Sequence, residues 1–135
     1  MDIARFSSGS PWEARVGYSR AVRVGDRIYV AGTTGILADG QPAEGLEAQA
    51  RRAIDVISDA LIALGGSLDT VVRTRTYLTD ISDWEVVGRV HSDAFSIARP
   101  AATMVEVSAL IDPRLLVEIE AEATVFGLNT QTPGT

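Results

Sequence analysis

The sequence lacks cysteine altogether and contains a single histidine, His91, among its 135 residues. Without cysteine the chain can form no disulfide, and it has neither a thiolate nucleophile nor a thiolate metal ligand. One histidine also excludes a metal centre that needs several imidazoles. We therefore expect no metal site, because a purely carboxylate site would have little else to support it.

Long apolar runs are missing as well. No run approaches the roughly 18–20 residues that a membrane-spanning helix needs. The first residues also lack the basic region and apolar region of a secretory signal. We therefore expect a cytoplasmic protein that has no membrane partner.

Basic residues are scarce relative to acidic ones. Lys and Arg together number 12 against 18 Asp and Glu, which gives a net charge of −6. Non-specific binding to nucleic acids and to anionic membranes relies on basic patches, so we expect no nucleic-acid partner. The length suits one domain, and a hydrophobic content of 46% is ordinary for a globular chain.

The first half of the chain combines a predicted hairpin with a long predicted helix. Residues 21–24 and 27–31 are β-rich and are joined by a Gly-Asp pair that is typical of a tight turn. A glycine-rich loop follows over 35–45. Apolar residues then recur at helical spacing over 46–64, and a Gly-Gly pair ends this helix.

The second half contains three predicted strands and a second helix. β-branched residues alternate over 71–78, which predicts a strand. A capping-box pattern, Ser82 followed by Glu85, predicts a helix that runs to about residue 97. Strands are expected over 102–108 and 115–125.

The two ends of the chain show no clear period. Residues 1–15 are rich in Ser, Gly and Pro, and we expect a loosely ordered lead-in there. Residues 128–135 are expected to form a flexible tail, which leaves one folded domain over 16–127. The predicted order is β-β-α-β-α-β-β, an α+β fold.

Layer packing predicts an oligomer for such a fold. Two amphipathic helices can cover only one face of a small mixed sheet. The other face must meet water or another subunit. The segment VEIEAEAT at 117–124 fits this, because its three glutamates alternate with apolar residues and share one face of a strand.

Several stretches, in their order and spacing, resemble the RidA (YjgF) family of reactive-intermediate deaminases. They are YSRAVRVGDRIYVAG, LEAQARRAIDVISDALIALGGSLDTVVRTRTYLTDISDW, RPAATMVEV and LLVEIEAEA. The resemblance implies a chorismate-mutase-like fold and a homotrimer with small-molecule pockets between its subunits. It also implies hydrolysis of 2-imino acids or their enamines to 2-oxo acids and ammonia, without a cofactor.

The resemblance assigns roles to particular residues. The glutamate of the VEIEA motif would hold the attacking water, and we assign that role to Glu120. Glu118 and Glu122 are expected to be structural, paired with strand arginines such as Arg73 or Arg75. The alternative for Glu120 is a solvated or salt-bridged strand glutamate, and the alternative for Glu118 and Glu122 is a catalytic role.

One departure from the family pattern bears on the substrate. The family has an arginine that grips the substrate carboxylate, and the matching segment here reads Pro100-Ala101-Ala102-Thr103. With Ala102 in the arginine's place, a contact worth on the order of 1.5–3 kcal/mol is lost. That corresponds to roughly ten- to hundredfold in affinity, so ordinary 2-imino acids are poor candidates.

The rest of the expected pocket is a mixture of matches and departures. Gly88 and Thr33 replace a family Asn and Gln, whereas Tyr18 and Gly32 match. Tyr18 and Trp84 have packing alternatives, and His91 is expected to be an ordinary helix residue. The candidate ligand-binding residues are Tyr18, Gly32, Thr33, Trp84, Gly88, Ala102 and Met104.

Three functions remain open at this level. The first is a cofactor-free hydrolase or deaminase that acts on a small neutral or amine-bearing intermediate. The second is a non-catalytic trimer that binds or senses a small molecule. The third is the endoribonuclease or translation-inhibitor activity that family labels sometimes carry, which the acidic charge disfavours.

Overall fold

The computed structural model describes residues 2–126, which form a single α+β domain. Within this range one sheet has six strands in the order β1-β2-β3-β6-β4-β5. Neighbouring strands are antiparallel except for the parallel pair β4–β5. The elements are β1 Ile3–Phe6, α1 Pro11–Val16, β2 Ala21–Val24, β3 Arg27–Thr34, α2 Leu46–Ala63, β4 Val71–Leu78, α3 Trp84–Phe95, β5 Ala101–Glu106 and β6 Val117–Thr124.

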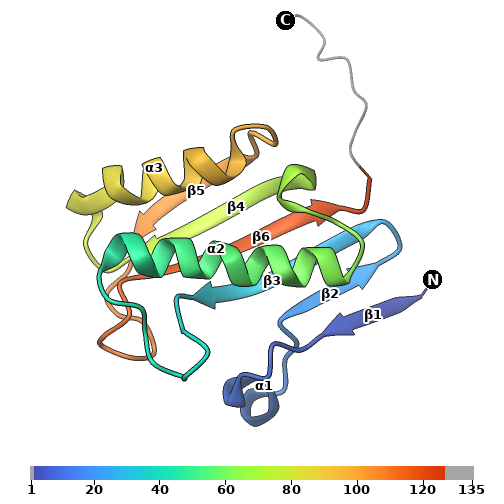
Figure 1. The fold of residues 1–135 in the computed structure, drawn as a ribbon, viewed down its shortest axis with the longest axis horizontal. Coiled ribbons are helices and arrows are strands. Elements are labelled where there is room, and N and C mark those ends of the chain that lie inside the picture. Colours follow the sequence, from blue (N-terminus) through green and yellow to red (C-terminus); the bar gives the residue numbers. More distant parts are fainter. Residues whose placement is uncertain (1, 127–135) are drawn as a thin grey trace, which may run out of the picture.

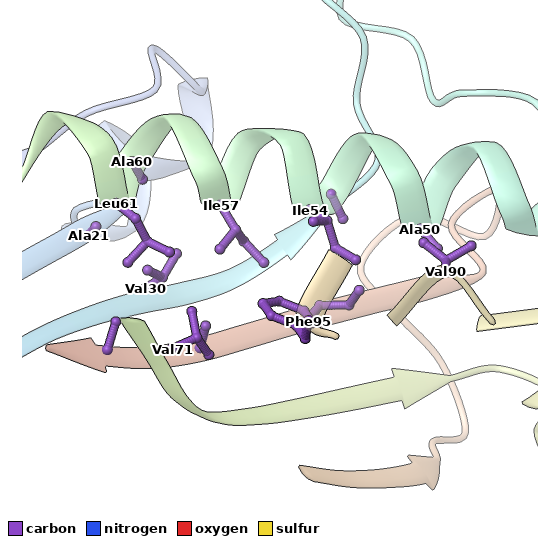
Figure 2. Close-up of a cluster of buried hydrophobic side chains, with 14 of the residues drawn as sticks. Ala21, Val30, Ala50, Ile54, Ile57, Ala60, Leu61, Val71, Val90 and Phe95 are labelled. Atoms are coloured by element: carbon purple, nitrogen blue, oxygen red, sulfur yellow. The ribbon is translucent and has the colours of Figure 1, made fainter. Parts of the chain in front are cut away.

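Helices α2 and α3 lie side by side over one face of the sheet, as the layer argument predicted (Figure 1). The apolar stripe of α2 supplies the centre of the core. Figure 2 shows Ile54, Ile57 and Leu61 pointing from this helix toward β3 and β6. Ile57 is fully buried, and burying a side chain of that size contributes roughly 1.5–3 kcal/mol.

Strand β6 has the alternation that its sequence predicted. Val117, Ile119, Ala121 and Ala123 are buried under the helices, and the residues between them are partly exposed. The glutamates therefore lie on the face that α2 and α3 leave uncovered. Among the described residues, no helix is long and apolar enough to cross a membrane.

The prediction of a loosely ordered segment over 1–15 was wrong, because this segment contains strand β1 and most of helix α1. Strand β1 pairs with β2 along its whole length, and α1 follows it. The helix begins at Pro11, and the hydroxyl of Ser10 accepts a hydrogen bond from the Trp12 amide. Ser followed by Pro is a sequence signal for the start of a helix, and it could have predicted α1. Strand β1 shows no hydrophobic period, because its formation depends on backbone pairing with β2.

The second helix begins and ends differently from its prediction. The capping box is not formed: the Ser82 hydroxyl donates to Asp80, and Asp80 caps a short 3₁₀ turn over Ile81–Asp83. Helix α3 then starts at Trp84 and ends at Phe95, before the expected residue 97. The Arg99 amide donates to the Phe95 carbonyl from a left-handed conformation that closes the helix.

The remaining boundaries shift by one or two residues. Strand β5 spans Ala101–Glu106 rather than 102–108, and β6 spans Val117–Thr124 rather than 115–125. The predicted tail over 128–135 lies outside the described residues.

Candidate functional site

The uncovered face of the sheet carries rows of charged side chains on β4 and β6. The register places Arg73 opposite Glu122, Arg75 opposite Glu120, and Tyr77 opposite Glu118. Arg75 Nη1 lies 4.0 Å from a carboxylate oxygen of Glu120 and 4.0 Å from one of Glu122, and Arg73 Nε lies 3.9 Å from Glu122. The predicted pairing of Glu122 with strand arginines is confirmed.

Glu120, the residue expected to hold the attacking water, already contacts side chains of β4 on this face. The Tyr77 hydroxyl donates a hydrogen bond to its Oε1 atom. This bond raises the pKa of Tyr77, and burial of the phenol adds to the effect. Glu120 therefore already has a hydrogen-bond donor and a cation from β4 around its carboxylate.

Glu118 has different surroundings because β3 contains a bulge. The register slips by one residue between Val30 and Thr33, so β3 has an extra residue opposite Glu120. The slip brings Gly32 against Glu118. A Cβ atom on Gly32 would lie 2.7 Å from Glu118 Oε1, so the carboxylate occupies space that only a glycine leaves free.

Glu118 was expected to be structural and paired with a strand arginine. Among residues 2–126 it forms no ion pair within 4.0 Å, although Glu120 and Glu122 do. Burial raises the pKa of Glu118, the Arg20 charge opposes this rise, and repulsion by Glu120 adds to it. The surroundings of Glu118 thus favour its protonated form.

A buried arginine joins three of the predicted site residues. Arg20 Nη1 donates to the Gly32 carbonyl at 2.6 Å and to the Thr33 hydroxyl at 3.0 Å. Its Nη2 donates to the Tyr18 hydroxyl at 3.1 Å. Thr33 is itself buried and its hydroxyl donates to the Ala31 carbonyl, so it acts on the site through Arg20.

Glu13 on α1 is the counter-ion of this arginine. Glu13 Oε2 lies 3.5 Å from Arg20 Nε, and both side chains are buried. Burial opposes the charge of Glu13, but hydrogen bonds from Ser8 and Ser7 and the Arg20 charge outweigh it and lower its pKa. An open hollow of about 280 Å³ beside this pair has Tyr18 on its wall.

The other predicted residues form a second group at the far edge of the sheet. Ala102 and Met104 on β5 are register partners of Thr74 and Thr76, whose side chains are buried under the helices. Gly88 on α3 is covered by Trp84, since a Cβ atom there would lie 3.7 Å from the indole ring. Trp84 itself is 53% exposed.

The two groups do not meet within one chain. Strands β6 and β4 separate β3 from β5, which amounts to roughly 14 Å across the sheet. Ala102 and Met104 also share the helix-covered face, whereas Glu118 lies on the uncovered one. Figure 1 shows β5 and the β1–α1 segment at opposite edges of the molecule.

His91 lies near this second group. Its Nε2 atom is 2.8 Å from the Thr74 hydroxyl, and its ring contacts Phe95 with centroids 4.6 Å apart. Burial lowers its pKa, which favours the neutral imidazole. A satisfied helix histidine, as expected, fits these contacts.

Arg20, Glu13 and Tyr77 are the site features that sequence patterns did not indicate. Arg20 stands two residues after Tyr18, and an arginine in a β-rich segment ordinarily points to solvent. Nothing in the sequence marks Glu13 as its partner. Among the described residues, no cluster of three His, Asp or Glu side chains could hold a metal ion.

Comparison with known proteins places these features in a family. The family described as Endoribonuclease L-PSP matches residues 9–125. A 2-iminobutanoate/2-iminopropanoate deaminase from Mus musculus is 35% identical over 125 residues, which cover 90% of this chain and 91% of the mouse protein. An uncharacterized Streptomyces coelicolor protein is 40% identical over 126 residues, 90% of this chain and 91% of its own.

Solved structures agree with this match. A Mycobacterium tuberculosis protein of the YjgF/YER057c/UK114 family is 52% identical, with a TM-score of 0.86 over 92% of this chain and 100% of its own. RidA from a Psychrobacter species is 33% identical, with a TM-score of 0.77 over 89% of this chain and 93% of its own.

Proposed function

The chain belongs to the Endoribonuclease L-PSP family, the RidA/YjgF family of its relatives, and from this premise we propose that it hydrolyses small reactive imines or enamines. The observation that carries the proposal is the position of Glu118. Its carboxyl lies against the Gly32 backbone, and Arg20 donates hydrogen bonds to both the Gly32 carbonyl and the Tyr18 hydroxyl.

The chemistry needs only water and one proton-transferring group. Water adds to the C=N carbon and gives up a proton, and the nitrogen then leaves as ammonia while the carbon becomes a carbonyl. A carboxylate can accept the proton from water and return it to the leaving nitrogen. A raised pKa suits this exchange, because a base works best when its pKa lies near the working pH.

The geometry favours Glu118 over Glu120 for this role. The resemblance assigned the role to Glu120, whose carboxylate accepts from Tyr77 and lies 4.0 Å from Arg75. Glu118 is instead adjacent to Gly32, and Arg20 links Gly32 to Tyr18. Gly32 and Tyr18 are both residues that match the family. Glu118 and Glu120 lie on the same face of β6, so matched Glu→Gln variants at the two positions can distinguish their roles.

We propose that the substrate has no carboxylate next to its imine. Ala102 cannot grip an anion, and Arg20 is no replacement because its nitrogens already contact Gly32, Thr33, Tyr18 and Glu13. Arg73 and Arg75 face the carboxylates of β6. A neutral or cationic imine therefore fits the charges around Glu118 better than a 2-imino acid does.

A homotrimer is part of the proposal. The group around Gly32 and the group around Ala102 lie on different faces, so no one chain can enclose a ligand with both. Adjacent subunits would bring the first group of one chain against the second group of its neighbour. The uncovered sheet face, with its partly exposed charged residues, supports burial in such an assembly.

Ammonia release tests the proposal directly. The substrates are 2-iminopropanoate, 2-iminobutanoate and the carboxylate-free imines of the same chain length. We expect turnover of the carboxylate-free imines to exceed that of the 2-imino acids. Glu118→Gln should lower this turnover by roughly 10²- to 10⁴-fold, the usual contribution of a proton-transferring side chain, while Glu120→Gln retains most of it.

The opposite pattern would return the role to Glu120. Fast turnover of the 2-imino acids by the wild type would overturn the proposed substrate class. Ala102→Arg is the matched gain-of-function variant, and we expect it to raise activity on 2-imino acids selectively.

Two other activities are outcomes of the same experiments. Calorimetric binding of an imine analogue without ammonia release would indicate the non-catalytic receptor, which the loss of the arginine also allows. Cleavage of RNA would indicate the ribonuclease of the family description. The net charge of −6 argues against it, because a phosphate backbone is held by cations.

A further inference from the structure

We propose that Arg20, with Glu13 as its counter-ion, is a positioning residue that fixes Tyr18 and the Gly32 backbone and supplies the cation facing Glu118. The inference rests on the proposed role of Glu118. It adds a residue that holds the site together and whose counter-ion, Glu13, lies in the segment over 1–15 that sequence patterns suggested was loosely ordered.

The side chain of Arg20 contacts two segments, the β3 bulge and the stretch between α1 and β2. Its Nη1 reaches the Gly32 carbonyl at the β3 bulge, where the ladder of backbone hydrogen bonds is interrupted. Its Nη2 reaches the Tyr18 hydroxyl in the segment between α1 and β2, and the guanidinium lies 5.4 Å from the centre of the Tyr18 ring. One rigid guanidinium thus sets the distance between Tyr18 and Gly32.

Glu13 balances the charge of Arg20 only in part. The closest atoms of the pair are 3.5 Å apart, beyond a good charge-assisted hydrogen bond. Within residues 2–126, Arg20 Nε and Glu13 Oε1 have no hydrogen-bond partner. A partly balanced cation in a low-dielectric setting acts on other charges nearby.

Glu118 is the charge on which it acts. Arg20 Nη1 and Glu118 Oε1 approach the same residue, Gly32, one at its carbonyl and the other where a Cβ would stand. The other groups facing Glu118 are Glu120 on its own strand and Tyr77 opposite on β4. Burial raises the pKa of Glu118, and the Arg20 charge is the contribution that opposes this rise.

Substitutions of the two partners should therefore move Glu118 in opposite directions. Arg20→Gln removes the cation, so the pKa of Glu118 should rise. Glu13→Gln removes the counter-ion of Arg20, so the attraction between the Arg20 charge and the Glu118 carboxylate is less compensated, and the pKa of Glu118 should fall. Arg20→Lys keeps the charge but cannot reproduce three contacts, so it should leave this pKa nearly unchanged and raise KM more than it lowers kcat.

Carboxyl-carbon NMR of the ¹³C-glutamate-labelled full chain measures this pKa without any substrate. The Glu118 signal is assigned by its loss in Glu118→Gln. Arg27→Gln is the control of equal charge change: Arg27 pairs with Thr124, roughly 20 Å along β6 from Glu118 and beyond the screening distance of about 10 Å at 0.1 M salt. It should leave the titration unchanged.

The inference is overturned if Arg20→Gln and Glu13→Gln titrate like the wild type, or shift Glu118 in the same direction. If Arg20→Gln fails to fold, the test uses Glu13→Gln and the double variant Arg20→Gln/Glu13→Gln, which leaves the net charge unchanged. The double variant should return Glu118 toward its wild-type pKa, and failure to do so counts against the inference. These titrations need no activity, so they stand apart from the turnover of Glu118→Gln.

Discussion

Two sets of arginine–carboxylate pairs lie on this domain and differ mainly in burial. In the pair of Arg20 and Glu13 the side chains are 7% and 6% exposed. In the pair of Arg75 and Glu120 they are 41% and 31% exposed. The separations are similar, 3.5 Å and 4.0 Å, so distance alone does not distinguish the two.

The difference teaches where charge matters in this fold. In the separated chain water screens the row of charges on β4 and β6, so each exposed pair contributes little to the stability of that chain. The side chains of Arg20 and Glu13 are largely buried, so removing one partner leaves the other charge poorly solvated. We therefore expect an arginine–glutamate pair to contribute little to stability on the sheet face and much more at the corner where β2, β3 and α1 meet.

Truncating each arginine is the strongest way to break this comparison. Arg20→Ala leaves Glu13 buried without its cation, and we expect it to lower the free energy of unfolding by about 3–5 kcal/mol. Arg75→Ala, the matched exposed variant, should lower it by about 1 kcal/mol or less. Urea unfolding at equal protein concentration measures both. Equal losses would show that the burial of Arg20 has no energetic consequence.

Adding one methyl group to two glycines gives a smaller effect. Gly32→Ala places a Cβ 2.7 Å from Glu118 Oε1, and because the end of this flexible side chain can move, we expect a cost at or below about 1 kcal/mol, the lower end of overpacking costs. Gly88→Ala meets only ordinary contact with Trp84, so its helix propensity should add roughly 0.5–1 kcal/mol of stability. Thermal unfolding measures both changes.

Activity gives the two glycine variants a second readout. Turnover should fall in Gly32→Ala, because the Glu118 side chain must move. A Gly32→Ala protein with wild-type stability and turnover would contradict the close approach of Gly32 and Glu118.

The pH dependence of stability should distinguish two glutamates with opposite shifts. Burial raises the pKa of Glu118 above its ordinary 4.5, so the folded state holds its proton more tightly than the unfolded state. Its stabilising contribution is complete below pH 4.5 and is lost as the pH rises through the folded pKa. Glu118→Gln should therefore gain stability relative to the wild type between acid and neutral pH.

Glu13 should behave in the opposite way. Although burial opposes its charge, hydrogen bonds from Ser8 and Ser7 and the Arg20 charge lower its pKa, so its contribution is present above pH 4.5 and is lost on acidification. Glu13→Gln should cost more stability at neutral pH than at acid pH. Urea unfolding from pH 3 to pH 8 tests the pair, and slopes of the same sign would reject the assigned shifts.

Much of the fold could be predicted because its signals are local. The apolar period of α2 and the strict alternation of β6 are each contained in one stretch of sequence, and both elements form as expected. Strand β1 escaped prediction because its stability comes from pairing with β2, whose residues lie 15 to 21 positions away from their partners in the sequence. The start of α3 was misplaced because Asp80, rather than Ser82, supplies the cap of the preceding turn.

The site was less predictable for the same reason. Alternation puts Glu118 and Glu120 on one face of β6 and cannot rank them. The bulge in β3 gives them different surroundings, because its extra residue brings Gly32 against Glu118. Arg20 gave no signal, because its partners Glu13 and Gly32 come from other segments.

The sequence by itself determined the periods of the strands and helices and the strand face that carries three glutamates. Those properties follow from the order of neighbouring residues. The replacement of a family arginine by Ala102 stays a prediction. Only the tertiary structure decided that Glu118 meets Gly32 and that a buried Arg20 joins Tyr18 to Gly32. Register, bulge and burial arise from contacts between distant segments, and these contacts set the dielectric and the charges around each carboxylate.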